Sequence, residues 1–445
     1  MENRKDFDFA EKSAVCAAVA DYLKSGAKAD GIFDRRFRSA RAPEARAGAN
    51  AVFKSFLRNF LPIKSAVCGL CKKSPRPALK AALFCACADL IMRRKTFQAV
   101  DPWVEFIKFK FSKGESGFAN ALLRKIPEIL ERTEKEAEKQ PSPENLSMAY
   151  SHPEWLVKKW ISEFGAEETV KILKNNRIPS DVFLRSSGSK SARDLEKKFE
   201  NSLRPSPFEN FKILEVGHWK AAEELLESGE FYAQDPSTSF APELLNPKTG
   251  ESILDLCAAP GGKSRMCADL VLRSAGFDRS ACSNSLLVSV DLPGPRMEKL
   301  SENLSKIDFI KSHSIASDLV SGSLAGELEK RGLPTLFNRV LLDAPCSNTG
   351  VLRRRPDARY RLEEEDISSC SELQKTLMAK AAKFTSRGGS FVYSTCSIER
   401  EENSENAEWF TGNFPDFELV QSKICIPGAF NDGGGSFLFK RRSLI

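Results

Sequence analysis

The C-terminal half of the chain carries the pattern that most restricts its fold, because short apolar segments alternate there with helical ones. Residues 252–256, 286–290, 339–342 and 390–393 are mainly apolar, and each is followed by turn residues and then by a helical pattern. Such alternation predicts a parallel sheet with helices on both faces, which binds ligands at the carboxyl ends of its strands. We therefore predict an α/β domain over residues 231–445 with its site at those ends.

The residues before this domain follow a different pattern. Apolar residues recur at spacings of three and four up to residue 131, which predicts an all-helical domain over residues 1–135. The run from residue 131 to 144 is charged and closed by two prolines, so we predict a linker over residues 136–150. Residues 151–230 mix helix-like and strand-like segments and are expected to form a small α+β module.

Charge is unevenly distributed along the chain. The net charge is +7 over 445 residues, but residues 1–130 hold 25 Lys and Arg against 13 Asp and Glu. The net charge is therefore about +12 for residues 1–130 and about −5 for the remainder of the chain. A basic module favours a polyanionic partner such as nucleic acid, although an ordinary solvated surface would have the same composition.

Apolar runs and cysteines indicate the surroundings of the protein. The most apolar run, residues 78–92, is interrupted by Lys80 and Asp89 and is too short for a bilayer, and the N-terminus carries acids. The twelve cysteines follow no regular short spacing, which indicates reduced thiols and not a disulfide framework. Both features predict a cytoplasmic protein with thiol chemistry available.

A Gly-Gly turn follows the first predicted strand of the α/β domain. Residues 255–264 read Asp-Leu-Cys-Ala-Ala-Pro-Gly-Gly-Lys-Ser. Gly261 and Gly262 let the backbone approach a ligand, and the following helix offers free N–H groups to an anion. The spacing matches neither the phosphate-binding loop of nucleotide kinases nor the dinucleotide fingerprint, so the turn indicates only a small-molecule site.

Acidic residues end three later strands. They are Asp291, Asp318 and Asp343. An acid at the position of Asp291 is placed to hydrogen-bond the ribose hydroxyls of a nucleoside, and Asp318 could reach an adenine ring. Each acid alone would more often be a solvated surface residue, but the three together favour an adenosine-containing cofactor.

Two cysteines occupy the ends of neighbouring strands. Cys346 lies in Asp-Ala-Pro-Cys-Ser and Cys396 in Ser-Thr-Cys-Ser. A lone cysteine is most often a small buried residue, but two beside a cofactor loop favour thiol chemistry. Attack of a thiolate on carbon 6 of cytosine makes carbon 5 nucleophilic enough to take a methyl group. A base or a second thiol can then remove the carbon 5 proton. Asp343 is placed to hydrogen-bond ring nitrogen 3 and take up developing charge. The three histidines are adjacent to neither cysteine, which argues against a Cys-His protease site.

These motifs resemble those of the bacterial 16S ribosomal RNA cytosine-5 methyltransferases of the RsmB/Sun type. The strong matches are residues 255–263, 343–351 and 394–404, and weaker ones are 117–124, 151–155 and 234–237. The resemblance covers nearly the whole chain. It implies a Rossmann-like S-adenosylmethionine-dependent methyltransferase domain preceded by an all-α NusB-like RNA-binding domain and a small RNA-binding module.

The resemblance also implies roles for individual residues. Cys396 would form the bond to carbon 6, and Cys346 would assist product release, a division that the residues alone leave open. S-adenosylmethionine would be held by Cys257, Ala258, Ala259, Pro260, Gly261, Gly262, Lys263, Asp291, Asp318 and Asp343. The basic loop of Arg353, Arg354, Arg355 and Arg359 is expected to contact phosphates of single-stranded or flipped-out RNA, with a plain solvated loop as the alternative.

The sequence departs from the family pattern in places. Residues 316–319 read Ala-Ser-Asp-Leu where the family has Gly-Asp-Gly or Gly-Asp-Ala, which weakens the adenine contact of Asp318, and residues 431–437 carry a glycine-rich insertion. In the front domain, Cys68 and Cys71 have the spacing of a zinc knuckle. Cys85 and Cys87, however, lie one residue apart in an apolar helical run, which favours buried helix cysteines.

Three functions remain in competition. The basic helical front and the motifs favour methylation of a cytosine in 16S ribosomal RNA. A tRNA cytosine-5 methyltransferase would share both thiol motifs but commonly lacks such a front domain. A non-catalytic RNA-binding assembly factor would have no use for two thiols beside a complete Gly-Gly-Lys loop. We therefore expect ribosomal RNA as partner and S-adenosylmethionine as cofactor, with no metal, no membrane and no obligate protein partner.

Overall fold

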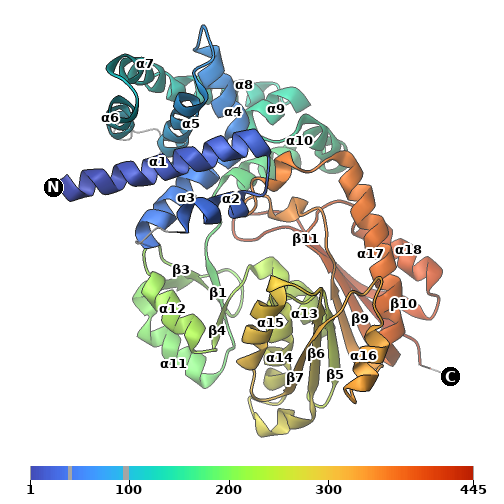
Figure 1. Cartoon of the computed structure of the whole chain (residues 1–445). Coiled ribbons are helices and arrows are strands. Elements are labelled where there is room, and N and C mark those ends of the chain that lie inside the picture. Colours follow the sequence, from blue (N-terminus) through green and yellow to red (C-terminus); the bar gives the residue numbers. More distant parts are fainter. Residues whose placement is uncertain (1, 39–42, 94–99, 444–445) are drawn as a thin grey trace. The chain divides into compact units, whose positions relative to one another are not determined.

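The structure is a computed structural model and describes residues 2–38, 43–93 and 100–443. The chain forms two compact units (Figure 1). The first comprises Met1–Pro179 with Leu352–Leu362, and the second comprises Ser180–Val351 with Glu363–Ile445. Within the described ranges, no helix combines the length and the apolar character needed to cross a membrane.

The first unit is built of helices (Figure 1). They are α1 (Glu2–Ser25), α2 (Ala29–Phe37), α3 (Pro43–Arg58), α4 (Phe60–Gly69), α5 (Pro77–Met92), α6 (Val100–Lys110), α7 (Lys113–Leu123), α8 (Ile126–Lys139), α9 (Pro143–Tyr150) and α10 (Glu154–Arg177), with the short 3-10 helix η6 (Ala358–Tyr360). The helical prediction for residues 1–135 is confirmed for the described part of that range.

The predicted linker over residues 136–150 is wrong. These residues form the end of α8 and the whole of α9, and Leu146, Ala149 and Tyr150 of α9 are buried. The charged run is the solvated face of an amphipathic helix. Its prolines mark a helix start, because Ser142 caps α9 by accepting the Asn145 N–H and Pro143 follows at the first helical position.

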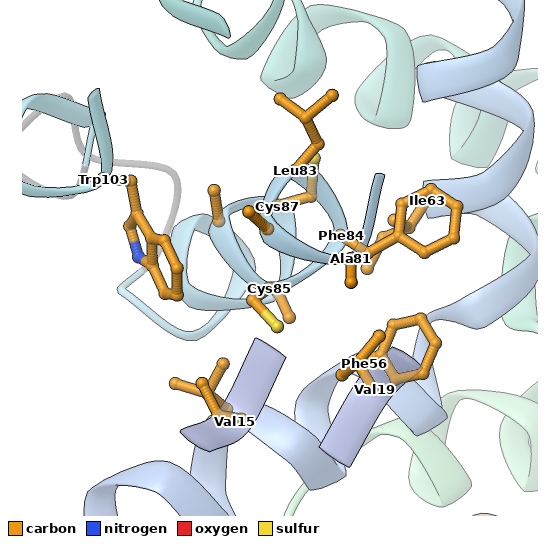
Figure 2. Packing of buried hydrophobic residues seen from close by; sticks show 14 of the residues in the cluster. Val15, Val19, Phe56, Ile63, Ala81, Leu83, Phe84, Cys85, Cys87 and Trp103 are labelled. Carbon is orange, nitrogen blue, oxygen red and sulfur yellow. The ribbon is translucent and has the colours of Figure 1, made fainter. Parts of the chain in front are cut away.

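Helix α5 lies at the centre of the first unit and packs against α1, α3, α4 and α6. It is apolar on all sides, as a helix buried all round should be. Figure 2 shows Cys85 and Cys87 on α5 among apolar side chains, and neither is exposed. The prediction that these two cysteines are buried helix residues is confirmed, whereas Cys68 at the end of α4 is exposed.

The second unit begins with a small antiparallel sheet. Its elements are β1 (Phe183–Ser186), α11 (Lys190–Lys198), η2 (Glu200–Ser202), β2 (Leu203–Pro205), β3 (Phe211–Leu214), α12 (Trp219–Glu227) and β4 (Phe231–Ala233). The strand order is β2-β3-β1-β4. The α+β module expected over residues 151–230 is therefore shorter than predicted, because α10 belongs to the first unit.

A seven-stranded sheet with order β10-β11-β9-β8-β5-β6-β7 follows. Its elements are η3 (Pro236–Ser239), α13 (Phe240–Leu245), β5 (Ser252–Leu256), α14 (Gly262–Ser274), η4 (Ser280–Asn284), β6 (Leu286–Asp291), α15 (Pro295–Ser305), β7 (Lys311–Ala316), α16 (Leu324–Lys330), β8 (Phe337–Asp343), η5 (Thr349–Val351), α17 (Glu364–Phe384), β9 (Thr385–Thr395), α18 (Ser404–Asn413), β10 (Phe417–Cys425) and β11 (Gly434–Arg441). Strands β5 to β9 are parallel to one another, and β10 and β11 add an antiparallel edge next to β9.

Two hydrophobic cores cover the two faces of this sheet. Helices α13, α14 and α15 pack on one face, and α16, α17 and α18 on the other (Figure 1). In β5, Leu254 and Leu256 belong to one core and Ile253 to the other, as expected for a strand buried on both sides. The predicted α/β fold is confirmed. Its strand order reverses between β5 and β8, so the carboxyl ends of β5, β6, β8 and β9 meet at the switch point.

Candidate active site

Residues 257–261 form the tight turn that joins β5 to α14. Cys257 and Gly261 have positive φ values of 60° and 105°, and α14 starts at Gly262. The N–H of Ala258 donates to the Val290 carbonyl at 2.9 Å, which fastens the turn to the end of β6. The turn therefore has a fixed shape at the place where the sheet opens.

The two glycines of this turn are closely packed by neighbouring side chains. A Cβ atom at Gly261 would lie 3.1 Å from Leu300 Cδ1, and one at Gly262 would lie 3.1 Å from Tyr232 Cε1. The close packing holds the amino terminus of α14 at the strand ends, where its N–H groups suit a carboxylate. This cradle fits the amino-acid end of an adenosine-containing cofactor.

Asp291 ends β6 beside the turn and is almost fully buried. Its carboxylate accepts the Ala259 N–H at 2.8 Å and the Leu292 N–H at 2.8 Å. Arg296 lies 3.8 Å from it and also donates to the Ala259 carbonyl. A carboxylate has about four acceptor positions, so Asp291 shapes the turn and keeps capacity for ribose hydroxyls.

Asp318 follows β7, but its carboxylate is used inside its own turn. It accepts the Val320 N–H at 2.8 Å and the Ser321 hydroxyl at 2.6 Å. These hydrogen bonds, that of Ser321 first, lower the pKa of Asp318. The structure gives this residue a turn-forming role and adds no support to its predicted adenine contact.

Lys263 and Asp343 form an ion pair between α14 and the end of β8. Lys263 Nζ lies 2.7 Å from Asp343 Oδ2, and Ser394 on β9 donates to the other oxygen at 3.1 Å. Burial lowers the pKa of Lys263, but the charge and hydrogen bond of Asp343, helped by Cys396, outweigh it and raise that pKa overall. Lys263 thus places a firmly held positive charge between the cofactor turn and Cys396.

Asp255 lies within β5 and is fully buried. One oxygen accepts the Ser264 hydroxyl, which in turn accepts a hydrogen bond from Ser289 at 3.0 Å, while the other oxygen has no partner among the described residues. Burial raises the pKa of Asp255 to about 7. The carboxyl under the cofactor turn is therefore costly to ionise.

The two predicted thiols are in contact. Cys346 Sγ lies 2.9 Å from Cys396 Sγ, and both residues are partly buried. The Gly350 N–H donates to the Cys396 carbonyl at 3.0 Å, and Asn348 donates to the Cys346 carbonyl at 2.7 Å. The hydrogen bond with Cys396 and burial raise the pKa of Cys346 well above its usual value. The structure thus brings Cys396, Cys346, Asp343, Lys263 and the turn together.

Sequence reasoning missed Glu402, whose buried carboxylate bonds the residues next to both cysteines. It lies in the run Glu-Arg-Glu-Glu-Asn after the second thiol motif, where Glu399 and Glu401 are equally acidic. No local signal distinguishes the carboxylate that turns toward the thiols.

The basic loop does not present its arginines as predicted. Arg359 is fully buried in the first unit, and its guanidinium donates to the carbonyls of Ser151, Asn176 and Leu352 at 3.1 to 3.2 Å. Arg353 is 2% exposed, and its carbonyl accepts from Arg58. Both side chains are buried within the first unit, which corrects their assignment as phosphate contacts.

The remaining two arginines of that loop are more accessible. Arg355 is exposed and Arg354 is partly exposed. Their predicted contact with RNA phosphate therefore stays a prediction.

Known proteins are similar to this chain in sequence. The model of the family "16S rRNA methyltransferase RsmB/F" matches residues 242–437. The probable ribosomal RNA small subunit methyltransferase B of Bacillus subtilis is 31% identical over 332 residues, which are 72% of this chain and 68% of that protein.

Solved structures extend the likeness over the fold. The crystal structure of PH0851 matches with a TM-score of 0.70 at 22% identity and covers 97% of this chain and 99% of that one. NSun6 from Pyrococcus horikoshii, crystallised with SFG, matches with a TM-score of 0.53 at 19% identity, over 65% and 98% of the two chains. The fold is that of the S-adenosylmethionine-dependent methyltransferases. The chain belongs to the RsmB/F family of ribosomal RNA methyltransferases.

Proposed function

We propose that this methyltransferase acts on carbon 5 of a cytosine in 16S ribosomal RNA through a covalent bond between Cys396 and carbon 6. The observation that carries the proposal is the contact between two thiols, 2.9 Å apart, beside the Lys263–Asp343 pair. A ribosomal RNA methyltransferase that modified a nucleophilic nitrogen or hydroxyl would need no thiol. Carbon 5 of cytosine needs one, because it becomes nucleophilic only after addition at carbon 6.

S-adenosylmethionine, when bound, supplies an electrophilic methyl group on a sulfonium. The turn of residues 257–262 and the amino terminus of α14 would hold its carboxylate, and Asp291 its ribose. Lys263 and Asp343 would border the methyl-transfer position. Asp318 would face the adenine side, with the least structural support because both its oxygens are engaged in its own turn.

The covalent step uses Cys396 and the pair beside it. Cys396 Sγ, as the thiolate, forms a bond to carbon 6, and the π electrons of the carbon 5–carbon 6 bond make carbon 5 able to accept the methyl group. Asp343 would hold a proton against ring nitrogen 3, where negative charge develops, and Lys263 would supply a positive charge beside the carboxyl group and the thiolate. The interaction of Lys263 with Cys396 supports the nucleophilic role that we propose for Cys396.

Release requires loss of the carbon 5 proton. Cys346 would take it, after which the carbon 5–carbon 6 double bond re-forms, the bond between sulfur and carbon 6 breaks, and Cys396 regains its thiolate. The hydrogen bond with Cys396 is the main cause that raises the pKa of Cys346. Once Cys396 is bonded to carbon, that hydrogen bond is lost, so Cys346 can give its own proton to solvent and, as the thiolate, accept the proton from carbon 5.

Two cysteine variants test these roles. Cys396→Ala should give no methylation of small-subunit RNA, whereas Cys346→Ala should methylate once and accumulate a protein–RNA adduct that survives denaturation. An adduct formed by Cys396→Ala and not by Cys346→Ala would reverse the roles. Absence of an adduct in both, with methylation intact, would refute a covalent mechanism.

Ribosomal RNA, the substrate class of the family, is favoured over tRNA by the basic helical front of the chain. We propose that this unit, which resembles NusB, binds the RNA through its cationic surface. Bisulfite sequencing of RNA from a strain lacking the gene should show one unprotected cytosine in 16S ribosomal RNA. Loss of a tRNA mark with ribosomal RNA unchanged would refute the choice of 16S RNA.

A further inference from the structure

Glu402 is a fully buried carboxylate that accepts four hydrogen bonds. One oxygen accepts the hydroxyls of Ser347 and of Ser397, the latter at 2.7 Å. The other accepts the Ser347 N–H at 2.9 Å and the Gln374 amide at 2.8 Å. Both oxygens are therefore fully engaged by three other residues.

Two of these partners are the chain neighbours of the thiols. Ser347 directly follows Cys346, and Ser397 directly follows Cys396. The two serines also contact each other, with their hydroxyl oxygens 3.1 Å apart. One carboxylate thus fastens the two cysteine loops together at a point one residue away from each sulfur.

The rest of the network holds the carboxylate itself in place. Gln374 on α17 donates both to Glu402 and to the carbonyl of Pro345, the residue before Cys346. Tyr393 on β9 donates to the Glu402 carbonyl. A buried charge is unfavourable unless its geometry is well satisfied, and a packed apolar residue could fill the same place without that cost. The charge and its four donors therefore call for a function beyond filling space.

We propose that Glu402 is a positioning residue for the two-thiol reaction and sets the spacing of the two sulfur atoms by holding the residue that follows each cysteine. The inference rests on the proposed function, and Glu402 acts through the cysteines without touching the base. Its negative charge is also one of the causes that raise the pKa of Cys346, after the hydrogen bond with Cys396 and burial. Glu402 thus acts on Cys346 through its charge as well as through the position of the loop.

The test is the Glu402→Gln variant, which keeps the shape of the side chain and removes its charge. In glutamine an NH2 group, which cannot accept hydrogen bonds, replaces one of the two carboxylate oxygens. The donors that bond that oxygen lose their acceptor, so the two loops lose at least one anchor. Displacements of about 1 Å slow a chemical step by up to about 100-fold. We expect release of the methylated RNA to slow by about 10-fold or more, so that a covalent adduct persists on a denaturing gel after a single turnover. Affinity for S-adenosylmethionine, measured by calorimetric titration, should stay within twofold.

Glu251→Gln is the matched control. Glu251 precedes β5, at the end of the strand opposite to the one that carries the site. Its carboxylate accepts from Arg339 and from the Lys248 N–H. This variant also loses a carboxylate with several donors but should release RNA at the wild-type rate. Ser397→Ala, which removes one anchor without touching the charge, should show a smaller adduct increase and serves if Glu402→Gln does not fold.

The outcomes separate this inference from the function on which it rests. If wild type methylates cytosine, Cys346→Ala traps the adduct, and Glu402→Gln and Ser397→Ala release RNA at the wild-type rate, the positioning role is refuted. Adduct accumulation by Glu251→Gln to the same extent would also refute it, since general destabilisation would then suffice. If wild type and Cys346→Ala form no adduct with small-subunit RNA, the proposed function itself fails.

Discussion

Replacing Asp255 by Asn tests how charge is balanced beneath the cofactor turn. Asp255 is fully buried in β5, with one oxygen bonded by Ser264 and the other without a partner among the described residues. Burial, its largest cause, raises the pKa to about 7, against about 3.9 in an unfolded chain. The asparagine amide has nearly the same shape and can still accept from Ser264, but it does not titrate.

The direction of the effect follows from proton binding. The folded state holds the Asp255 proton more tightly than the unfolded state, so this residue makes stability fall as pH rises from about 4 to about 7. A difference of about three in pKa corresponds to on the order of 4 kcal/mol once both states are ionised. About 2 kcal/mol of that loss should fall between pH 5 and pH 7.

The stability of Asp255→Asn relative to wild type should therefore increase by about 2 kcal/mol between pH 5 and pH 7, because other titrating groups cancel in the difference. In a unit of this size the change amounts to roughly 4 to 8 °C in melting temperature. Calorimetry at several pH values measures it, and hydrogen exchange of β5 peptides assigns the transition. A difference that stays constant, or shrinks, as pH rises would refute the reasoning.

Three further changes probe the rest of the chain. Arg359→Met removes a donor from three buried carbonyls, of which that of Ser151 keeps the Tyr360 hydroxyl, and should destabilise the first unit by about 3 kcal/mol in urea unfolding. Unchanged stability with weaker RNA binding would restore its role as a phosphate contact. Gly261→Ala strains a backbone at φ 105° and crowds Leu300, so calorimetric titration should show S-adenosylmethionine affinity reduced by about 10-fold, and equal affinity would contradict the cradle. Cys87→Ser buries a hydroxyl in the helical core and should lower stability against thermal unfolding by about 2 kcal/mol. Cys68→Ser on the surface should change nothing measurable, and equal effects of the two substitutions would contradict the difference in burial.

Local patterns predicted much of the fold. The alternation of apolar strands and helices is a property of neighbouring residues, so it predicted the parallel sheet and the place of the turn at residues 257–262. Chain order also predicted that Cys346 and Cys396 end neighbouring strands. Strands β10 and β11 escaped prediction, since β10 is an exposed edge strand with few buried residues to give it a period.

Charged residues were predicted less well, because a charged side chain is expected to be exposed to solvent until its partners in the fold are known. The run of residues 131–144 looked like a linker and is mostly helix, with its charges on the solvated face. Arg359 looked like a phosphate contact but is buried, because residues 352–362 pack within the first unit. Its partners, the carbonyls of Ser151 and Asn176, are 208 and 183 residues away in the chain.

The sequence by itself determined the α/β sheet, the cofactor turn and the two thiols at its edge, since periodicity and turn chemistry depend on residues close together in the chain. Only the tertiary structure decided which charges are buried: Asp255 beneath the turn, Glu402 between the cysteine loops and Arg359 in the helical unit. A buried charge is stable only where donors or acceptors from distant segments surround it, and the assembled fold alone brings those segments together.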